Sequence, residues 1–310
     1  MTDYLQYLRS SFLGNVNTLA EHKKTVAKKP DIFSGIAQLQ KHCSHETEAD
    51  PHLPVFIFSA GWRSGSTLLQ RLLMSDPDLF IWGEPFDHCG IVQALAETTK
   101  AFTPEWPPER YFYDGSNAQE LSGRWIADLY PSLEELRQGH RAIFESMFAK
   151  PAGKAGATRW GLKEVRLGAE HAYYLKWLFP KARFLFIYRN PLEAYRSYCG
   201  HGRAWYDAWP SKPVFTATQF GQHWKRLVSG YLAHASAVDG LLIPYEKLIA
   251  GGDVIDTIEG FLGVSVDRQI LSSKIGTSDR GGKKIWVSRL DKWLLKRVVT
   301  KTAKPLGYVW

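Results

Sequence analysis

Cysteine is scarce in this sequence of 310 residues. Cys43, Cys89 and Cys199 are the three that occur; they lie far apart, are odd in number and form no Cys-x-x-Cys pair. The pattern therefore supports neither a disulfide framework nor a structural zinc site. We expect a protein of a reducing compartment, the cytoplasm, and we expect no metal at its functional site.

Long apolar runs are also missing. No stretch approaches about 18 uninterrupted apolar residues, the length at which a helix begins to span a bilayer. The N-terminus lacks the basic start followed by an apolar run that marks a signal peptide. The sequence therefore predicts a soluble protein rather than a secreted or membrane-spanning one.

The composition is that of a globular protein with a surplus of positive charge. Hydrophobic residues make up 45% and charged residues 23%, which excludes the disordered and collagen-like classes. Lys and Arg number 39 against 31 Asp and Glu, a net charge of +8. This surplus favours an anionic ligand: nucleic acid, anionic lipid, or a phosphorylated or sulfated small molecule. Since no basic and aromatic pattern matches a nucleic-acid module, we expect no nucleic-acid partner.

Short apolar runs alternate with helical apolar spacing along most of the chain. Strands are expected at 55–61, 79–82, 159–165 and 183–189, and 240–248 is expected to supply another strand followed by a turn. Helices are expected at 32–42, 64–75, 169–178, 190–198, 216–235, 253–264 and 288–304. Asn190 can cap the helix at 190–198 with Pro191 at its first position, and the helix at 253–264 is expected to stop at Gly263. This alternation predicts a three-layer α/β fold, in which helices flank both faces of a mostly parallel central sheet.

A polar, proline-bounded stretch at 45–54 marks a boundary. It separates an N-terminal helical segment, residues 1–50 with a further helix near 3–13, from a main domain over 51–310. Residues 89–148 are expected to be mainly helical, with proline-rich breaks.

The sequence GWRSGSTLL (61–69) is the first candidate for an anion-binding site. Successive N–H groups of a glycine-rich turn, together with those at a helix start, form an anion cradle. Ser64, Ser66 and Thr67 add hydroxyl donors, and Arg63 adds a positive charge. The Walker A pattern is absent because no Lys follows Gly65.

The sequence YRNPLEAYRS (188–197) is the second candidate. Arg189 ends a predicted strand, and Ser197 lies about two helical turns further on. A bidentate Arg beside a hydroxyl donor suits a phosphate or sulfate group. Two such sites at the carboxyl ends of neighbouring strands predict a nucleotide with two separated anionic groups.

Three segments in the same order carry a resemblance to a known family. GWRSGSTLLQRLL (61–73) resembles the 5′-phosphosulfate-binding loop of sulfotransferases that use 3′-phosphoadenylyl sulfate, PAPS. FIYRNPLEAYRSY (186–198) resembles their 3′-phosphate-binding element, and LIPYEKLIAGGDVIDTIEGFLGV (242–264) resembles the segment that follows it. The resemblance spans 54–264 and implies a P-loop-like fold. Arg63 replaces the Lys of cytosolic phenol and steroid enzymes, so the loop looks more like those of carbohydrate and protein-tyrosine sulfotransferases.

The resemblance implies how the donor PAPS is held. The 5′-phosphosulfate would lie on Ser64, Gly65, Ser66 and Thr67, with Arg63 bridging it. The 3′-phosphate would lie on Arg189 and Ser197, with Tyr245 near it. The segment TSDRGGKKIW (277–286) is similar in composition to the family's cofactor-closing loop, so Arg280, Lys283 and Lys284 either close over the nucleotide or form a solvated turn.

Two further segments resemble catalytic elements of the family. WGEPFD (82–87) makes Glu84 the candidate base that removes the acceptor proton, with His88 as the rival. WGLKEVR (160–166) makes Lys163 the candidate that stabilises the leaving phosphate together with Arg63. Sulfuryl transfer depends mainly on positioning and on cations facing the charged oxygens, so these residue types suit the reaction.

The acceptor is expected to be a hydroxyl compound: a glycan, glycolipid, peptide tyrosine or small alcohol. Its walls are expected in 89–150 and in the cluster RAWYDAWP (203–210), where Trp205, Tyr206 and Trp209 stack on a ring or pack in the core. A P-loop kinase with an unusual loop and a non-catalytic nucleotide-binding protein are the alternatives. The sequence assigns no oligomeric state.

The last predicted helix has a basic side. Lys292, Lys296, Arg297 and Lys301 either touch an anionic membrane weakly or are solvated. In the solvated arrangement, the apolar residues of the helix are expected to pack inward: Leu290, Trp293, Leu294 and Val298.

Overall fold

The computed structural model describes residues 30–42, 53–84, 90–200, 207–208, 212–272 and 286–309. The predicted helix near 3–13 lies outside these ranges. The helix predicted at 32–42 is confirmed as α3, Ile32–His42. Its buried apolar residues join the same hydrophobic cluster as the main sheet, while the boundary predicted near residue 50 stays a prediction.

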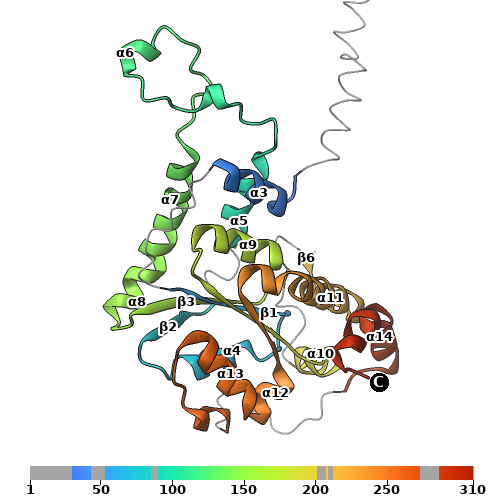
Figure 1. The fold of residues 1–310 in the computed structure, drawn as a ribbon. Coiled ribbons are helices and arrows are strands. Elements are labelled where there is room, and N and C mark those ends of the chain that lie inside the picture. The colour runs from blue at the N-terminus through green and yellow to red at the C-terminus, as the bar shows by residue number, and fades with distance from the viewer. Residues whose placement is uncertain are drawn as a thin grey trace, which may run out of the picture.

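A five-stranded sheet forms the centre of the molecule (Figure 1). Its strands are β1 (Val55–Ser59), β2 (Leu79–Trp82), β3 (Arg159–Glu164), β4 (Arg183–Tyr188) and β7 (Gly240–Pro244). Their order is β2-β3-β1-β4-β7, and every neighbouring pair is parallel. All five predicted strands and the three-layer α/β fold class are thus confirmed. A separate antiparallel ribbon pairs β5 (Asp207–Ala208) with β6 (Lys212–Pro213).

The central strand β1 shows why the sheet is covered on both faces. All five of its residues are buried. Phe56 and Phe58 pack into one hydrophobic cluster, and Val55 and Ile57 pack into the other. Because successive side chains of a strand point to opposite faces, an uninterrupted apolar run requires helices on both sides.

The helices form the two outer layers (Figure 1). They are α3, α4 (Ser66–Leu73), α5 (Ile91–Thr98), α6 (Ala118–Leu121), α7 (Leu133–Phe144), α8 (Lys150–Lys154), α9 (Ala169–Leu178), α10 (Pro191–Cys199), α11 (Ala217–His234), α12 (Tyr245–Ala250), α13 (Asp253–Leu262) and α14 (Arg289–Ala303). Short turns are η1 (Thr99–Ala101), η2 (Glu109–Tyr111), η5 (Ala235–Val238), η6 (Arg268–Leu271) and η7 (Lys304–Leu306); η3 (Glu145–Ala149) is a π-helix. One cluster contains α4, α12 and α13; the other contains α3, α9 and α11.

Local sequence signals set several helix ends. The Asn190 side chain accepts hydrogen bonds from the backbone N–H groups of Leu192 and Glu193, and Pro191 opens α10, as predicted. Gly263 ends α13 in a left-handed conformation with φ 66°. After β7 the sequence predicted a turn, whereas the structure contains the short helix α12.

The proline-rich break predicted at 103–111 is confirmed, but the prediction that the rest of 89–148 is mainly helical is wrong over 112–131. Over 103–131 the chain leaves α5 and η1, forms only short turns and the four-residue α6, and returns at α7. Figure 1 shows this excursion projecting away from the sheet. Pro104, Pro107 and Pro108 interrupt any helical ladder at its start. The excursion exposes several large apolar side chains: Trp106, Tyr113, Trp125, Ile126, Leu129 and Tyr130.

The last helix also differs from its prediction. Leu290 and Trp293, expected to pack inward, are 63% and 54% exposed. Leu295, Val299 and Ala303 fill the inner face instead, with Leu294 and Val298 packed against it. The inner stripe of α14 is therefore narrower than a count of its apolar residues suggests.

No helix in the described part of the chain is both long and apolar enough to cross a bilayer. Over the same ranges, no group of three or more His, Cys, Asp or Glu is arranged to hold a metal ion.

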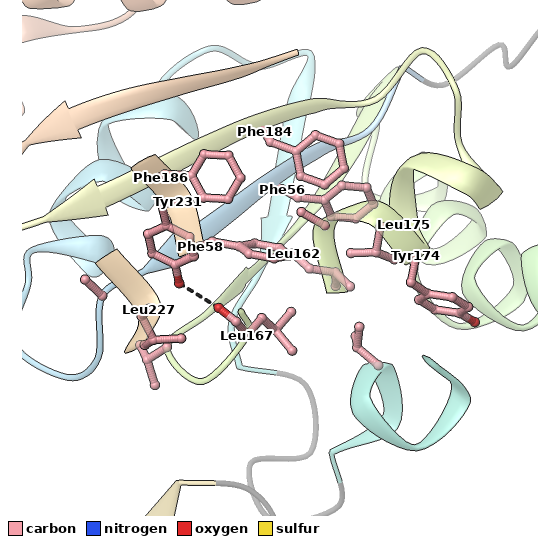
Figure 2. Packing of buried hydrophobic residues seen from close by; sticks show 14 of the residues in the cluster. Phe56, Phe58, Leu162, Leu167, Tyr174, Leu175, Phe184, Phe186, Leu227 and Tyr231 are labelled. Carbon is pink, nitrogen blue, oxygen red and sulfur yellow. Dashed lines mark hydrogen bonds between the residues drawn. The ribbon is translucent and has the colours of Figure 1, made fainter. Parts of the chain in front are cut away.

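Tyr231 of α11 joins a helix to the strand ends. Its hydroxyl lies 2.6 Å from the carbonyl oxygen of Leu167 (Figure 2) and 3.1 Å from that of Ser59. The ring packs on Phe186 and Phe58 in the core and is fully buried. Burial raises the pKa of Tyr231 well above its ordinary value, so the hydroxyl stays protonated and donates.

We expect Tyr231→Phe to lower the free energy of unfolding by about 2 kcal/mol, because it leaves buried carbonyl groups without this donor. Urea denaturation monitored by circular dichroism measures the difference. Tyr173→Phe, on the partly buried face of α9, is the matched control and should cost much less. Equal losses in both variants would contradict a special role for the Tyr231 hydroxyl.

Candidate active site

The predicted site residues gather at one edge of the sheet. Because all five strands are parallel, their carboxyl ends meet there, and open α/β sheets bind ligands at this edge. Each strand contributes one position: Ser64 after β1, Glu84 after β2, Lys163 near the end of β3, Arg189 after β4 and Tyr245 after β7.

The turn between β1 and α4 has the backbone of an anion cradle. Gly61, Arg63 and Gly65 have positive φ values of 81°, 67° and 94°, while Trp62 and Ser64 between them do not. Successive residues of alternating hand point their N–H groups into a shared concavity that binds anions. Gly65 also caps the N-terminus of α4, which adds the partial positive charge of a helix start.

Gly65 is required by a close approach as well as by its conformation. A Cβ atom at this position would lie 2.2 Å from Cδ2 of Tyr245. The first residue of α12 therefore packs directly on the turn after β1. This contact brings the segment after β7 to the turn, although Gly65 and Tyr245 are 180 positions apart in the sequence.

Hydrogen bonds join the two candidate anion sites. Arg63 Nε donates to Ser197 Oγ at 3.0 Å, and Arg189 Nη1 donates to the Arg63 carbonyl oxygen at 3.2 Å. The turn after β1 is thus in direct contact with the segment 189–197, which follows β4 and includes most of α10. The two elements face one location instead of opposite sides of the molecule.

Arg189 is held in place from several sides. Its guanidinium lies over the Tyr245 ring, 4.4 Å from the ring centre, where a cation is attracted to the aromatic face. Its carbonyl oxygen accepts a hydrogen bond from the Trp224 indole at 3.1 Å. Next to it, the Asn190 backbone N–H donates to Glu246 Oε1 at 2.8 Å, and Tyr308 donates to Glu246 Oε2 at 2.8 Å.

The hydroxyl residues of the turn differ in exposure. Ser64 is fully buried, and its Oγ donates to the Ala60 carbonyl oxygen at 3.1 Å, so this side chain also shapes the turn. Ser66 is 6% exposed at the start of α4, whereas Thr67 is exposed.

Glu84 lies between two cations. Lys163 Nζ donates to Glu84 Oε1 at 2.6 Å, and Arg166 Nη1 donates to Glu84 Oε2 at 3.2 Å. Lys163 and Arg166 are almost fully buried, whereas the Glu84 side chain is about a quarter exposed. The structure thus brings together Glu84 and Lys163, predicted from separate segments, and adds Arg166.

Arg166 also contacts a second carboxylate. Its Nη1 lies 3.2 Å from Oε1 of Glu164, which is 3% exposed. Burial raises the pKa of Glu164 to about 6, although the nearby Arg166 cation opposes this effect. Glu164 and Arg166 are not among the predicted site residues; their signal is a run of charges, KEVR, at the end of an apolar strand.

His223 of α11 is a buried histidine behind the turn. Its ring stacks on Trp62 with a centroid distance of 5.0 Å, and its Cδ2 lies beside Gly61. Burial lowers the pKa of His223 to about 3, helped by the positive charges of Arg226 and Arg166 and opposed by a hydrogen bond with the Val165 backbone. Its Nε2 has no hydrogen-bond partner in the described part of the protein. No sequence motif marked this residue.

Several predicted residues lie outside the described ranges. They are the rival base His88, the closing-loop residues Arg280, Lys283 and Lys284, and the aromatic residues Trp205, Tyr206 and Trp209.

The comparison with family models agrees with the geometry of this edge. The model of the sulfotransferase family matches residues 54–268, well over half of the chain. The chain belongs to the sulfotransferase family. The match includes each described site residue that the sequence predicted, from Arg63 to Tyr245. A comparison with curated proteins found no significant relative.

Solved structures similar to this sulfotransferase are distant. The sulfotransferase domain of a Synechococcus olefin synthase is 18% identical, with 86% of this chain and 98% of that one covered and a TM-score of 0.45. A mouse sulfotransferase complexed with PAP is 14% identical, with 88% and 90% covered and a TM-score of 0.41. A Mycobacterium avium sulfotransferase is also 14% identical, with 88% and 83% covered and a TM-score of 0.40.

Because His223 is buried, we expect the free energy of unfolding of this sulfotransferase to fall in acid. In the unfolded chain the imidazole takes up a proton below about pH 6.5, but in the folded protein only near pH 3. Acid therefore favours the unfolded state. Between pH 8 and pH 4.5 this residue should remove about 3 kcal/mol from the free energy of unfolding.

We expect His223→Gln to be less stable at pH 8 and to lose less stability on acidification than the wild type. Urea denaturation at the two pH values measures both quantities. An equal loss in variant and wild type would show that His223 is protonated in the folded protein over this range.

Proposed function

We propose that this sulfotransferase moves the sulfuryl group of PAPS to an acceptor hydroxyl. One observation carries the proposal: the hydrogen bond from Arg63 to Ser197, which joins the turn after β1 to the last turn of α10. A donor with a 5′-phosphosulfate and a separate 3′-phosphate needs two anion sites that share one location. These two elements supply them.

The donor would be held as follows. The N–H groups of Ser64, Gly65, Ser66 and Thr67, together with the hydroxyls of Ser66 and Thr67, would bind the 5′-phosphosulfate. Arg189 and Ser197 would bind the 3′-phosphate, with the Tyr245 ring keeping the guanidinium oriented. A phosphate oxygen accepts a stronger hydrogen bond from a guanidinium than from a neutral donor, because both partners are charged.

The proposed reaction is a direct transfer in which the attacking and leaving oxygens lie in line on opposite sides of sulfur. The acceptor oxygen forms a bond to sulfur as its proton passes to the base, and the bond between sulfur and the bridging phosphate oxygen breaks. Adenosine 3′,5′-bisphosphate leaves. Arg63 and Lys163 would stabilise the negative charge that develops on the leaving phosphate, which is the main requirement of such transfers.

Glu84 is the proposed base. Its carboxylate can accept the acceptor proton. Hydrogen bonds from Lys163 and Arg166 hold the two carboxylate oxygens in place. Lys163 thus contacts the base and is also proposed to contact the leaving group. Arg166 in turn is a positioning residue, because it links Glu84 to the buried Glu164.

The donor is tested by thermal unfolding with two nucleotides. A ligand at 100 times its dissociation constant adds about 2.7 kcal/mol of stability. We expect adenosine 3′,5′-bisphosphate to produce such a shift and ATP with Mg²⁺ to produce little. The opposite order would favour a P-loop kinase.

Arg189→Ala should reduce the preference for adenosine 3′,5′-bisphosphate over adenosine 5′-phosphate about tenfold or more, because it removes a charge-assisted contact to the 3′-phosphate. Isothermal titration calorimetry measures both affinities. Arg196→Ala, an exposed residue of α10 paired with Glu193, is the matched control. An unchanged preference in Arg189→Ala would place the 3′-phosphate elsewhere.

Glu84→Gln should lower kcat by about 10²- to 10⁴-fold, the usual contribution of a positioned base, while binding of the bisphosphate is retained. Transfer of labelled sulfate from PAPS to a phenol, a monosaccharide, a glycolipid and a tyrosine peptide measures turnover. Glu193→Gln controls for loss of a carboxylate on α10. Activity near the wild-type level in Glu84→Gln would favour His88 as base, whereas binding without any wild-type turnover would favour a non-catalytic binder.

A further inference from the structure

The helix α14 has two apolar faces of different kinds. Its inner face buries Leu295, Val299 and Ala303 completely, and the helix packs on α11 and α10. Its outer face carries Leu290 and Trp293, which lie about one turn apart and are 63% and 54% exposed. Trp286, just before the helix, is 78% exposed. Packing within the described part of the chain accounts for the inner face and leaves the outer face exposed.

Helix α14 lies at the periphery of the fold (Figure 1), and Leu290 and Trp293 are exposed on it. Isolated exposed apolar residues are ordinary, but an exposed Trp and Leu on adjacent turns form a continuous patch. The patch is distant in the fold from the excursion at 103–131, which carries the other exposed tryptophans, Trp106 and Trp125.

Cations surround this patch. Between residues 286 and 309 the chain has six basic residues and one acidic residue, Asp291. The basic residues are Arg289, Lys292, Lys296, Arg297, Lys301 and Lys304. A hollow of about 380 Å³ opens beside Trp293 and is lined by Lys296, Arg297, Thr300 and Lys304. Its cations and hydroxyl suit an anionic head group next to an apolar side chain.

We infer that the outer face of α14 docks on an anionic membrane surface. Helices that lie in the plane of a bilayer combine Trp and Leu on one side with Lys and Arg beside them, and anionic lipids attract the cations. Trp293 and Leu290 would enter the head-group boundary, while Lys292 and Lys301 would contact lipid phosphates. The Arg297 guanidinium, 5.5 Å from the Trp293 ring centre, joins the two kinds of contact.

Charge argues against a symmetric contact between two copies of this face. In a twofold contact the same patch meets itself, so the six cations of one chain would lie against six of the other. Such like-charge contacts are costly. A nucleic acid would pair with the cations but would leave Leu290 exposed. An anionic bilayer would contact both the cations and the apolar patch.

This inference goes beyond the proposed function and does not depend on it. Leu290, Trp293, Lys292 and Lys301 have no place in the proposed donor site or in catalysis. Membrane binding is measured without turnover, so failure of one proposal leaves the other unaffected.

The experiment is sedimentation of the full chain with vesicles. Vesicles of phosphatidylcholine alone are compared with vesicles that also contain phosphatidylglycerol. We expect binding to the anionic vesicles to be about tenfold stronger or more, and to weaken as salt is added, because salt screens the attraction between surface charges.

Two double variants separate the contributions of the surface. Leu290→Ser with Trp293→Ser removes the apolar patch, and Lys292→Gln with Lys301→Gln removes two exposed cations. Each should lower binding to anionic vesicles about tenfold or more. The matched controls are Trp125→Ser on the excursion and Lys150→Gln with Lys154→Gln on α8, which should bind as the wild type does. Thermal unfolding checks that every variant is folded.

Three outcomes would overturn the inference. Equal binding to both kinds of vesicle would exclude an anionic membrane. Binding that both double variants retain would exclude this face. Absence of vesicle binding would also overturn it. In that case, dimers in sedimentation velocity that the Leu290→Ser and Trp293→Ser double variant no longer forms would identify a second copy as the occupant. Binding of a DNA duplex that only the Lys292→Gln and Lys301→Gln double variant loses would identify a nucleic acid.

Discussion

The contact between the turn after β1 and the segment 189–197 is the interaction on which the proposed site depends. Two hydrogen bonds, from Arg63 to Ser197 in the last turn of α10 and from Arg189 to the Arg63 carbonyl, bring two cationic segments together. The packing of Tyr245 on Gly65 adds the segment after β7. Since β1 lies between β3 and β4 and all are parallel, the sheet delivers these segments to one edge.

The same edge concentrates positive charge, and the structure compensates it locally. Lys163 and Arg166 are buried but share Glu84, and Arg166 also contacts Glu164. Arg189 lies against an aromatic face. Such partners reduce the cost of burying or crowding cations. They also fix where the cations point, which is what transfer of a charged group between oxygens demands.

Surface features show where apolar residues remain outside the core. The excursion at 103–131 and the outer face of α14 both expose tryptophans, but only α14 surrounds them with cations. The apolar residues of α14 predict a wide buried stripe that includes Leu290 and Trp293. The neighbouring helices α11 and α10 cover only a narrower stripe and leave these two side chains exposed. Which apolar side chains are buried depends on the neighbouring helices, and a single helix sequence does not contain that information.

The order of strands and helices, the caps at Asn190 and Gly263, and the two candidate anion-binding segments followed from the sequence alone, because period, capping and turn chemistry are local properties. The apolar run of β1 likewise required cover on both faces. The tertiary structure decided what depends on distant segments: the meeting of Glu84 with Lys163 and Arg166, the burial of Glu164 and His223, and the irregular path of 103–131. Those contacts join positions up to 161 residues apart, from Trp62 to His223, and no local pattern encodes them.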